Sequence, residues 1–157
     1  MELEEAKKMG LELMETSKAA YLTTIDNEGF PITRAIFNLK NKEQFPEFSR
    51  FFQKQSDEFL IFISTNTSSS KTVHIKKNPA ICVYYCDAED FKGFMLGGLA
   101  DVITDLEIKK EIWLDWWTKY YLKGVEDPDY SLIRLHPTQA RFYYKLNQIN
   151  FELGQSK

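Results

Sequence analysis

The pattern of apolar and polar positions divides the chain into short alternating segments joined by turns, with few helical stretches. Helical spacing of apolar residues predicts helices over 2–17, 43–55 and 104–122, and a short one beginning near residue 70. Two-residue alternation and apolar runs predict strands at 19–25, 32–40, 59–65, 80–86, 93–104, 132–135 and 140–153. Short strands with hairpin connections favour a mainly β (α+β) fold, a small antiparallel barrel with peripheral helices in a single domain over residues 1–157.

The first hairpin carries the clearest turn signal. Asp26-Asn-Glu-Gly29 separates two alternating segments, and in the second of them Arg34 shares a face with Ile32 and Ile36. Ala35 belongs to the opposite face. These two segments therefore form an antiparallel pair that sets one cationic side chain among apolar neighbours.

The predicted helix over 104–122 has an unusual aromatic content. Thr104-Asp-Leu-Glu107 matches a capping box, and Gly124 and Pro128 follow as stop signals. An aromatic stripe runs along it, formed by Trp113, Trp116, Trp117, Tyr120 and Tyr121. Because interface cores favour Trp and Tyr, this stripe predicts a homodimer interface. The alternative is that the stripe packs wholly against its own barrel.

Charge and composition exclude several classes of protein. The formal net charge of −3 and pI near 5.5 give no basic field for nucleic acid. No apolar run is long enough for a membrane span, and the acidic start Met-Glu-Leu-Glu-Glu is unlike a signal peptide, so we expect a cytoplasmic protein without a membrane partner. Cys82 and Cys86, with only His74 and His136 beside them in the whole chain, do not predict a metal site.

The segment Ser64-Thr-Asn-Thr-Ser-Ser-Ser-Lys71-Thr is the strongest candidate for a binding site. Its hydroxyls, the charge of Lys71 and the N–H groups of a helix beginning near Ser70 suit a phosphate. It lacks the glycines of a P-loop, so any anion would be held by side chains. The alternative interpretation is that these residues only cap the helix and solvate a loop.

Several motifs, taken in order, resemble one family. They are Asp26-Asn-Glu-Gly-Phe-Pro-x-x-Arg34-Ala35, Ser64-Thr65-Asn66, Ser69-Ser70-Lys71, Asn78-Pro79, Asp101-Val-Ile-Thr-Asp, Gly124-Val-Glu-Asp127-Pro128-Asp-Tyr and Leu135-His-Pro137-x-x-Ala-Arg-Phe-Tyr143. From about Ala19 to Leu153 the chain is similar to the pyridoxamine 5'-phosphate oxidase-like FMN-binding split barrels, in their short general-stress-protein branch. The resemblance implies a six-stranded split barrel and a homodimer with FMN at the subunit interface.

The same resemblance implies roles for individual residues. Arg34, Ser70 and Lys71 would hold the FMN phosphate, while the backbone of Ala35 and Ile36 would run beside the isoalloxazine. Ser64 and Thr65 would lie near the ribityl chain, Tyr143 would stack on the ring, and Trp117 would approach from the partner subunit. Where the family often carries an acidic residue and a tryptophan, this chain has Arg141 and Tyr143.

Three functional classes stay open at this point. The first is an FMN-dependent oxidoreductase acting on a small molecule, with NADH or NADPH as electron donor, and the absence of a nucleophile–base pair or Rossmann fingerprint is consistent with it. The second is a module that stores or senses FMN without turnover. The third is a split barrel binding a deazaflavin or haem, for which His74 is the candidate haem ligand. The segment that grips pyridoxal phosphate in the true oxidases has no counterpart before Lys157, so that reaction is not predicted.

Overall fold

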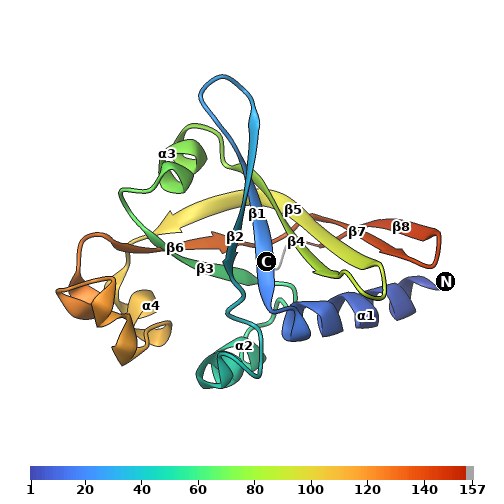
Figure 1. Cartoon of the computed structure of the whole chain (residues 1–157), viewed down its shortest axis with the longest axis horizontal. Coiled ribbons are helices and arrows are strands. Elements are labelled where there is room, and N and C mark those ends of the chain that lie inside the picture. The colour runs from blue at the N-terminus through green and yellow to red at the C-terminus, as the bar shows by residue number, and fades with distance from the viewer. Residues whose placement is uncertain (155–157) are drawn as a thin grey trace.

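An eight-stranded antiparallel sheet forms most of this computed structural model, which describes residues 1–154 (Figure 1). The sheet curls into a half-barrel. Six strands follow in the order β2-β1-β4-β5-β6-β3, and the hairpin β7–β8 pairs with β5 beside this path. The strands are β1 (Ala19–Ile25), β2 (Pro31–Phe37), β3 (Ile61–Asn66), β4 (Ala80–Asp87), β5 (Lys92–Ile103), β6 (Tyr130–Leu135), β7 (Gln139–Tyr144) and β8 (Asn147–Glu152). The predicted antiparallel barrel is confirmed.

The barrel is split between β2 and β3. These strands are the two ends of the hydrogen-bonded path, and within residues 1–154 no strand ladder joins them. β5 is long enough to serve both halves, because its first part pairs with β4 and β7 and its last part with β6. The split is therefore the gap between the unpaired edges of β2 and β3.

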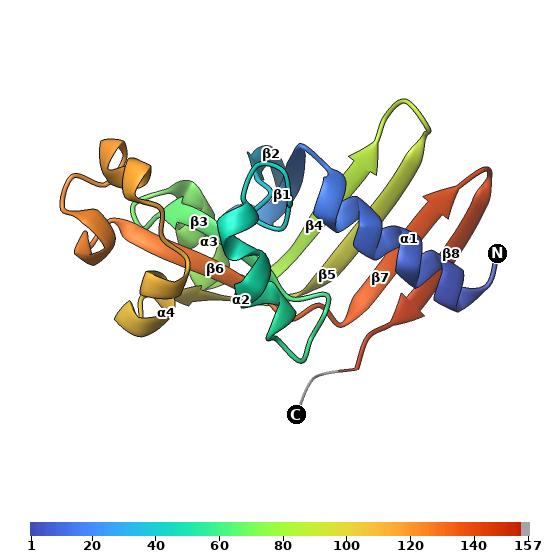
Figure 2. The same cartoon turned by 90° about the horizontal axis from the view of Figure 1, so that it is seen from below.

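Short helices surround this sheet. They are α1 (Leu3–Thr16), α2 (Ser49–Gln53), α3 (Ser70–Lys77) and α4 (Leu106–Glu111), with 3₁₀ turns η1 (Pro46–Phe48), η2 (Asp115–Lys119) and η3 (Gly124–Glu126). α1 lies across β4, β5, β7 and β8 and buries Ala6, Leu13 and Met14 on them (Figure 2). Gly10 permits this approach, since a Cβ there would lie 2.8 Å from the Phe94 ring. Within the described residues, no helix combines the length and the apolar character that a membrane span requires.

The alternation predicted for the second strand is confirmed, with Arg34 and Ile36 turned inward and Ala35 outward. The strand ends at Phe37 instead of residue 40. The Asn38 amide donates to the carbonyl oxygens of Met14 and Ser17, both at 2.8 Å, and so holds the chain against the end of α1. The predicted helix over 43–55 becomes η1 followed by α2, because the Asn41 side chain accepts the N–H groups of residues 43 and 44 in a turn.

The predicted helix over 104–122 is wrong. α4 ends after six residues, and the Tyr130 hydroxyl, instead of a helical N–H, bonds the carbonyl oxygen of Ile112. The N-cap is Asp105, which accepts the N–H of Ile108 at 3.1 Å, instead of Thr104. The chain resumes as η2 and places Trp117 in a second core on the outer side of β3 and β6.

The aromatic stripe consequently divides into two groups. Trp117 is 1% exposed and Tyr121 is 6% exposed, and both pack on Tyr130. Trp116 and Tyr120 remain about half exposed, at 47% and 50%. Trp113, Trp117 and Tyr121 therefore pack against their own barrel, whereas Trp116 and Tyr120 stay exposed, and the continuous aromatic helix predicted for an interface is not formed.

The predicted last strand over 140–153 is a hairpin. Lys145 and Leu146 have φ values of 49° and 63°, and they form a two-residue turn between Tyr144 and Asn147. Such turns usually contain Asn or Gly, and neither occupies the two turn positions. The sequence therefore carried no signal for this turn.

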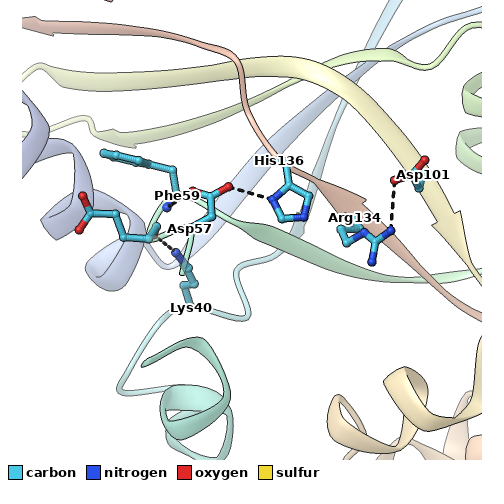
Figure 3. Close-up of polar contacts among 7 residues, drawn as sticks. Lys40, Asp57, Phe59, Asp101, Arg134 and His136 are labelled. Carbon is cyan, nitrogen blue, oxygen red and sulfur yellow. Dashed lines mark hydrogen bonds and ion pairs between the residues drawn. The ribbon is translucent and has the colours of Figure 1, made fainter. Parts of the chain in front are cut away.

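Polar contacts tie the segment after β2 to the start of β3 and to the β6–β7 connection (Figure 3). The Lys40 ammonium donates to the Glu58 carbonyl oxygen and lies 5.2 Å from the centre of the Phe52 ring. Asp57 accepts the N–H of Phe59 at 3.0 Å and contacts His136 Nδ1 at 2.9 Å. Burial lowers the pKa of Lys40 to about 8, and nearby carboxylates, Asp57 first, offset only part of this shift.

Lys40 makes folding depend on pH in the alkaline range. The unfolded lysine has a pKa of about 10.4, so between pH 8 and pH 10 the unfolded chain binds more protons and the free energy of unfolding rises with pH. We expect the stability of the wild type relative to Lys40→Met to increase by about 1–2 kcal/mol over this range. Urea unfolding at each pH measures it. Lys42→Met is the matched control, because the Lys42 side chain is 55% exposed, and a flat difference for both variants would contradict the assignment.

Candidate functional site

A cleft of about 600 Å³ opens at the split of the barrel. One wall comes from β1 and β2, through Ala19, Ala35, Ile36 and Phe37, and the floor comes from Ser64, Thr65 and Asn66 at the end of β3. Lys71 of α3, Lys18 and Gln44 contribute polar groups. The opposite wall is aromatic and consists of Trp117, Tyr120 and Tyr121. We call this the β2–β3 cleft.

Six of the nine residues predicted for the site line this cleft. They are Ala35, Ile36, Ser64, Thr65, Lys71 and Trp117. Trp117 reaches the cleft of its own chain, whereas the prediction had it approach from the partner subunit. Arg34 and Ser70 do not line the cleft. The Arg34 side chain lies on the face of β2 opposite Ala35, near enough to Lys71 for its charge to affect the Lys71 pKa, and Ser70 is the exposed first residue of α3. The structure thus brings the β2 arginine, the end of β3 and the start of α3 to one place, although they are distant in sequence.

Two cations meet at this place without an acidic partner. Burial lowers the pKa of Arg34, and burial together with the positive charge of Arg34 lowers the pKa of Lys71. Neither side chain forms an ion pair with a carboxylate of residues 1–154. The first N–H groups of α3 lie beside Lys71 and have no partner within the helix. This corner of the cleft is therefore suited to an anion.

The hydroxyl-rich loop is mostly occupied with its own structure. Thr72 donates to the carbonyl oxygen of Ser69 at 2.8 Å, and Thr67 bonds both Pro128 and Ser131. Ser69 is the N-cap residue, but its hydroxyl contacts Thr65 at 3.2 Å instead of capping the helix. Among the described residues, the side chains of Ser64 and Ser70 make no hydrogen bond. Only part of the run is thus available to a ligand.

Asp129 anchors this loop from the far side. Its carboxylate accepts from the Asn66 amide at 2.7 Å and from the Ser68 N–H at 2.8 Å, and its carbonyl oxygen accepts the Thr67 N–H. These hydrogen bonds lower the pKa of Asp129. The carboxylate therefore stays ionised at neutral pH. It fixes the loop that leads from the end of β3 to the start of α3.

The aromatic wall has one unsatisfied donor. Trp117 Nε1 is buried and has no hydrogen-bond partner within residues 1–154. Tyr121 beside it has its pKa raised to about 12 by burial first and then by Asp129 and Asp127, so its hydroxyl stays neutral. The wall therefore offers flat aromatic surface, chiefly through the half-exposed Tyr120, while Trp117 Nε1 is closed to the cleft.

Tyr143 lies elsewhere on the sheet. It lines a second hollow of about 390 Å³ on the outer face, with Tyr84, Met95 and Arg141. In the sheet register, Ala35 pairs with Tyr21, Tyr21 with Tyr84, Tyr84 with Met95, and Met95 with Arg141. Four strand spacings of about 4.8 Å separate the β2–β3 cleft from Arg141, which is about 19 Å. Tyr143 of the same chain therefore does not reach the cleft.

Sequence reasoning missed several residues at this site. Lys18, Phe37 and Gln44 line the cleft, but no motif marks them, and Tyr120 was predicted only as part of the aromatic stripe. Thr24 and His74 contact each other beneath Arg34, at 2.8 Å, and the hydroxyl of Thr24 contacts Arg34 at 2.7 Å. The inward alternation of β1 could have indicated Thr24, because it is a polar residue on an apolar face. His74 does not line the cleft.

A family model matches this arrangement. The model described as pyridoxamine 5'-phosphate oxidase like matches residues 50–154, about two thirds of the chain, including β3, α3 and the aromatic wall. The chain belongs to the pyridoxamine 5'-phosphate oxidase-like family. A comparison with curated protein sequences found no match.

Solved structures of the same fold include several family members. A Clostridium acetobutylicum protein related to general stress protein 26 of B. subtilis, in the pyridoxinephosphate oxidase family, is 28% identical, with a TM-score of 0.76 over 98% of this chain and 97% of its own. General stress protein 26 from Bacillus anthracis is 20% identical, with a TM-score of 0.66 over 96% and 100%. A haem-binding protein from Mycobacterium smegmatis is 13% identical, with a TM-score of 0.66 over 94% of this chain and 57% of its own. The last two likenesses concern the fold alone.

Proposed function

We propose that this protein is an FMN-binding flavoprotein and that the β2–β3 cleft holds the cofactor. The observation that carries the proposal is the pair of cations, Arg34 and Lys71, held without a carboxylate at the open split of a pyridoxamine 5'-phosphate oxidase-like barrel. A phosphate matches this charge, and the first turn of α3 adds N–H donors. The cleft volume of about 600 Å³ falls in the range of small-molecule sites.

Each wall of the cleft has a part in holding the cofactor. Arg34, Lys71 and Ser70 would bind the phosphate, and Ser64 and Thr65 would contact the ribityl hydroxyls. The backbone of Ala35 and Ile36 would meet the polar edge of the ring. Trp117 would support the aromatic wall from behind, since it is 1% exposed and its Nε1 is buried, and Tyr120 would meet the cofactor. When bound, FMN supplies two-electron transfer chemistry, and the protein fixes its orientation and limits solvent access.

We further propose a homodimer formed through the outer face of the sheet. Tyr21, Phe37 and Tyr84 are exposed on that face at 38%, 47% and 40%. The β2–β3 cleft and the hollow at Tyr143 lie at opposite ends of the same face. A twofold axis between them would bring Tyr143 of a second copy to the cleft of the first, twice per dimer. This replaces the interface predicted along the aromatic helix.

The dimer has a direct test. We expect sedimentation to give twice the monomer mass at micromolar concentration and Tyr84→Asp to shift the protein toward monomer, because a buried carboxylate at an interface is costly. Leu3→Asp is the matched control, since Leu3 is 41% exposed on α1, which packs on the opposite face of the sheet. A monomeric wild type that binds FMN tightly would contradict the shared site.

The reaction we propose is electron transfer between a diffusible small molecule and the bound flavin, with NADH or NADPH as donor. The aromatic wall of Tyr120 and Trp117 supports a flat partner. Anaerobic mixing of the FMN-loaded protein with reduced nicotinamide should bleach the flavin absorbance, and a quinone acceptor should restore it. Tight FMN binding without reduction by either nicotinamide would favour storage or sensing of FMN instead. A cytoplasmic location stays a prediction.

A further inference from the structure

Thr24 connects Arg34 and His74 beneath the corner of the cleft that is suited to an anion. It is 0% exposed, and its Oγ1 lies 2.7 Å from Arg34 Nη1 and 2.8 Å from His74 Nδ1. Thr24 belongs to β1, Arg34 to β2 and His74 to α3. We call these three side chains the Thr24 bridge.

The chemistry of the groups fixes the direction of the hydrogen bond to Arg34 and favours one direction for the hydrogen bond to His74. A guanidinium only donates, so the Thr24 oxygen accepts from Arg34. A threonine hydroxyl has one hydrogen, and His74 Nδ1 is the one acceptor that it contacts among the described residues. The hydroxyl can therefore donate to Nδ1. In that arrangement His74 carries its proton on Nε2.

The bridge also sets which edge of Arg34 remains available. Nη1 carries two hydrogens, and these are used by Thr24 Oγ1 and by the Ile32 carbonyl oxygen at 3.0 Å, with a longer contact of 3.4 Å to the Leu22 carbonyl oxygen. Nε and Nη2 make no hydrogen bond to residues 1–154. That free edge can bind two phosphate oxygens in parallel, and Lys71 stands one helical turn before His74 on α3.

We propose that Thr24 and His74 are positioning residues for the phosphate of the cofactor, and this rests on the proposed FMN site. They act through Arg34: His74 orients the Thr24 hydroxyl, which holds one edge of the guanidinium and presents the other to the phosphate. α3 thereby supplies both a phosphate-binding cation and the support for the second cation. The role is specific to phosphate, because Thr24 and His74 do not line the cleft and would affect the cofactor only through Arg34.

Paired ligands and paired variants test the role. Thr24→Val keeps the shape and removes the hydroxyl, and we expect it to weaken FMN about tenfold or more while riboflavin changes by less than about threefold. Thr24→Ser should restore FMN affinity. In an Arg34→Ala background, Thr24→Val should have no further effect on FMN, because its partner is gone. The role would be overturned if Thr24→Val weakened FMN and riboflavin equally. It would also be overturned if Thr24→Val weakened FMN as much in the Arg34→Ala background as in the wild type.

The tautomer of His74 gives a readout without any ligand. The chain contains two histidines, so ¹⁵N shifts of the imidazoles can be assigned with a single His136→Gln variant. We expect the Nε2–H form at His74 in the wild type and a changed Nδ1 shift in Thr24→Val. A proton on Nδ1 would overturn the bridge itself. A wild type with the Nε2–H form that binds no FMN would overturn the proposed function and, with it, the phosphate role.

Discussion

We expect replacement of Lys71 by alanine to weaken FMN binding by about 10- to 100-fold and to leave riboflavin binding within about threefold, because a charge-assisted hydrogen bond to phosphate is worth about 1.5–3 kcal/mol. Arg34→Ala is expected to act in the same direction. Together the two cations would give the protein its expected preference for FMN over riboflavin. Fluorescence quenching of each flavin during titration measures both affinities.

A control variant on the same helix separates the effect of a direct contact with phosphate from the effect of losing one positive charge. Lys76 is an exposed lysine of α3, so Lys76→Ala removes the same charge without touching the cleft. We expect a change of less than about threefold for FMN, since exposed charges at a distance are screened by salt. If Lys71→Ala weakens FMN and riboflavin equally, Lys71 does not bind the phosphate.

The second large effect concerns the aromatic wall. Trp117→Ala is expected to lower the free energy of unfolding by about 3–5 kcal/mol, because it leaves a large cavity in the second core. Trp116→Ala, one residue earlier and 47% exposed, should change it by less than about 0.5 kcal/mol. Urea unfolding of the two variants makes the comparison. Equal losses would mean that both rings are buried, as in a dimer interface along this segment.

The first hairpin and the elements that carry Arg34 and Lys71 were predictable because they depend on local signals. Asp26 and Gly29 mark a tight turn, and the alternation after it fixed the inward face of Arg34. The run from Ser64 to Lys71 between a strand and a helix marked the start of α3. Alternation and turn chemistry act over a few residues, so they are legible in a single sequence.

Other features depended on contacts between distant residues. The helix predicted over 104–122 is interrupted because the hydroxyl of Tyr130, 18 positions later in the chain than Ile112, takes the Ile112 carbonyl oxygen. The turn at Lys145 and Leu146 adopts a left-handed backbone that its residue types do not signal. The support of Arg34 by His74 arises only when α3 packs against β1. Local patterns carry no information about such tertiary contacts.

The most direct test of the central claim is the visible spectrum of the purified protein, followed by release and chromatography of its chromophore. Bound FMN should give absorbance bands of an oxidised flavin and a released compound that co-migrates with FMN. The Arg34→Ala, Lys71→Ala double variant should purify without it. A released haem or deazaflavin, or a wild-type protein that stays colourless after incubation with FMN, would contradict the account.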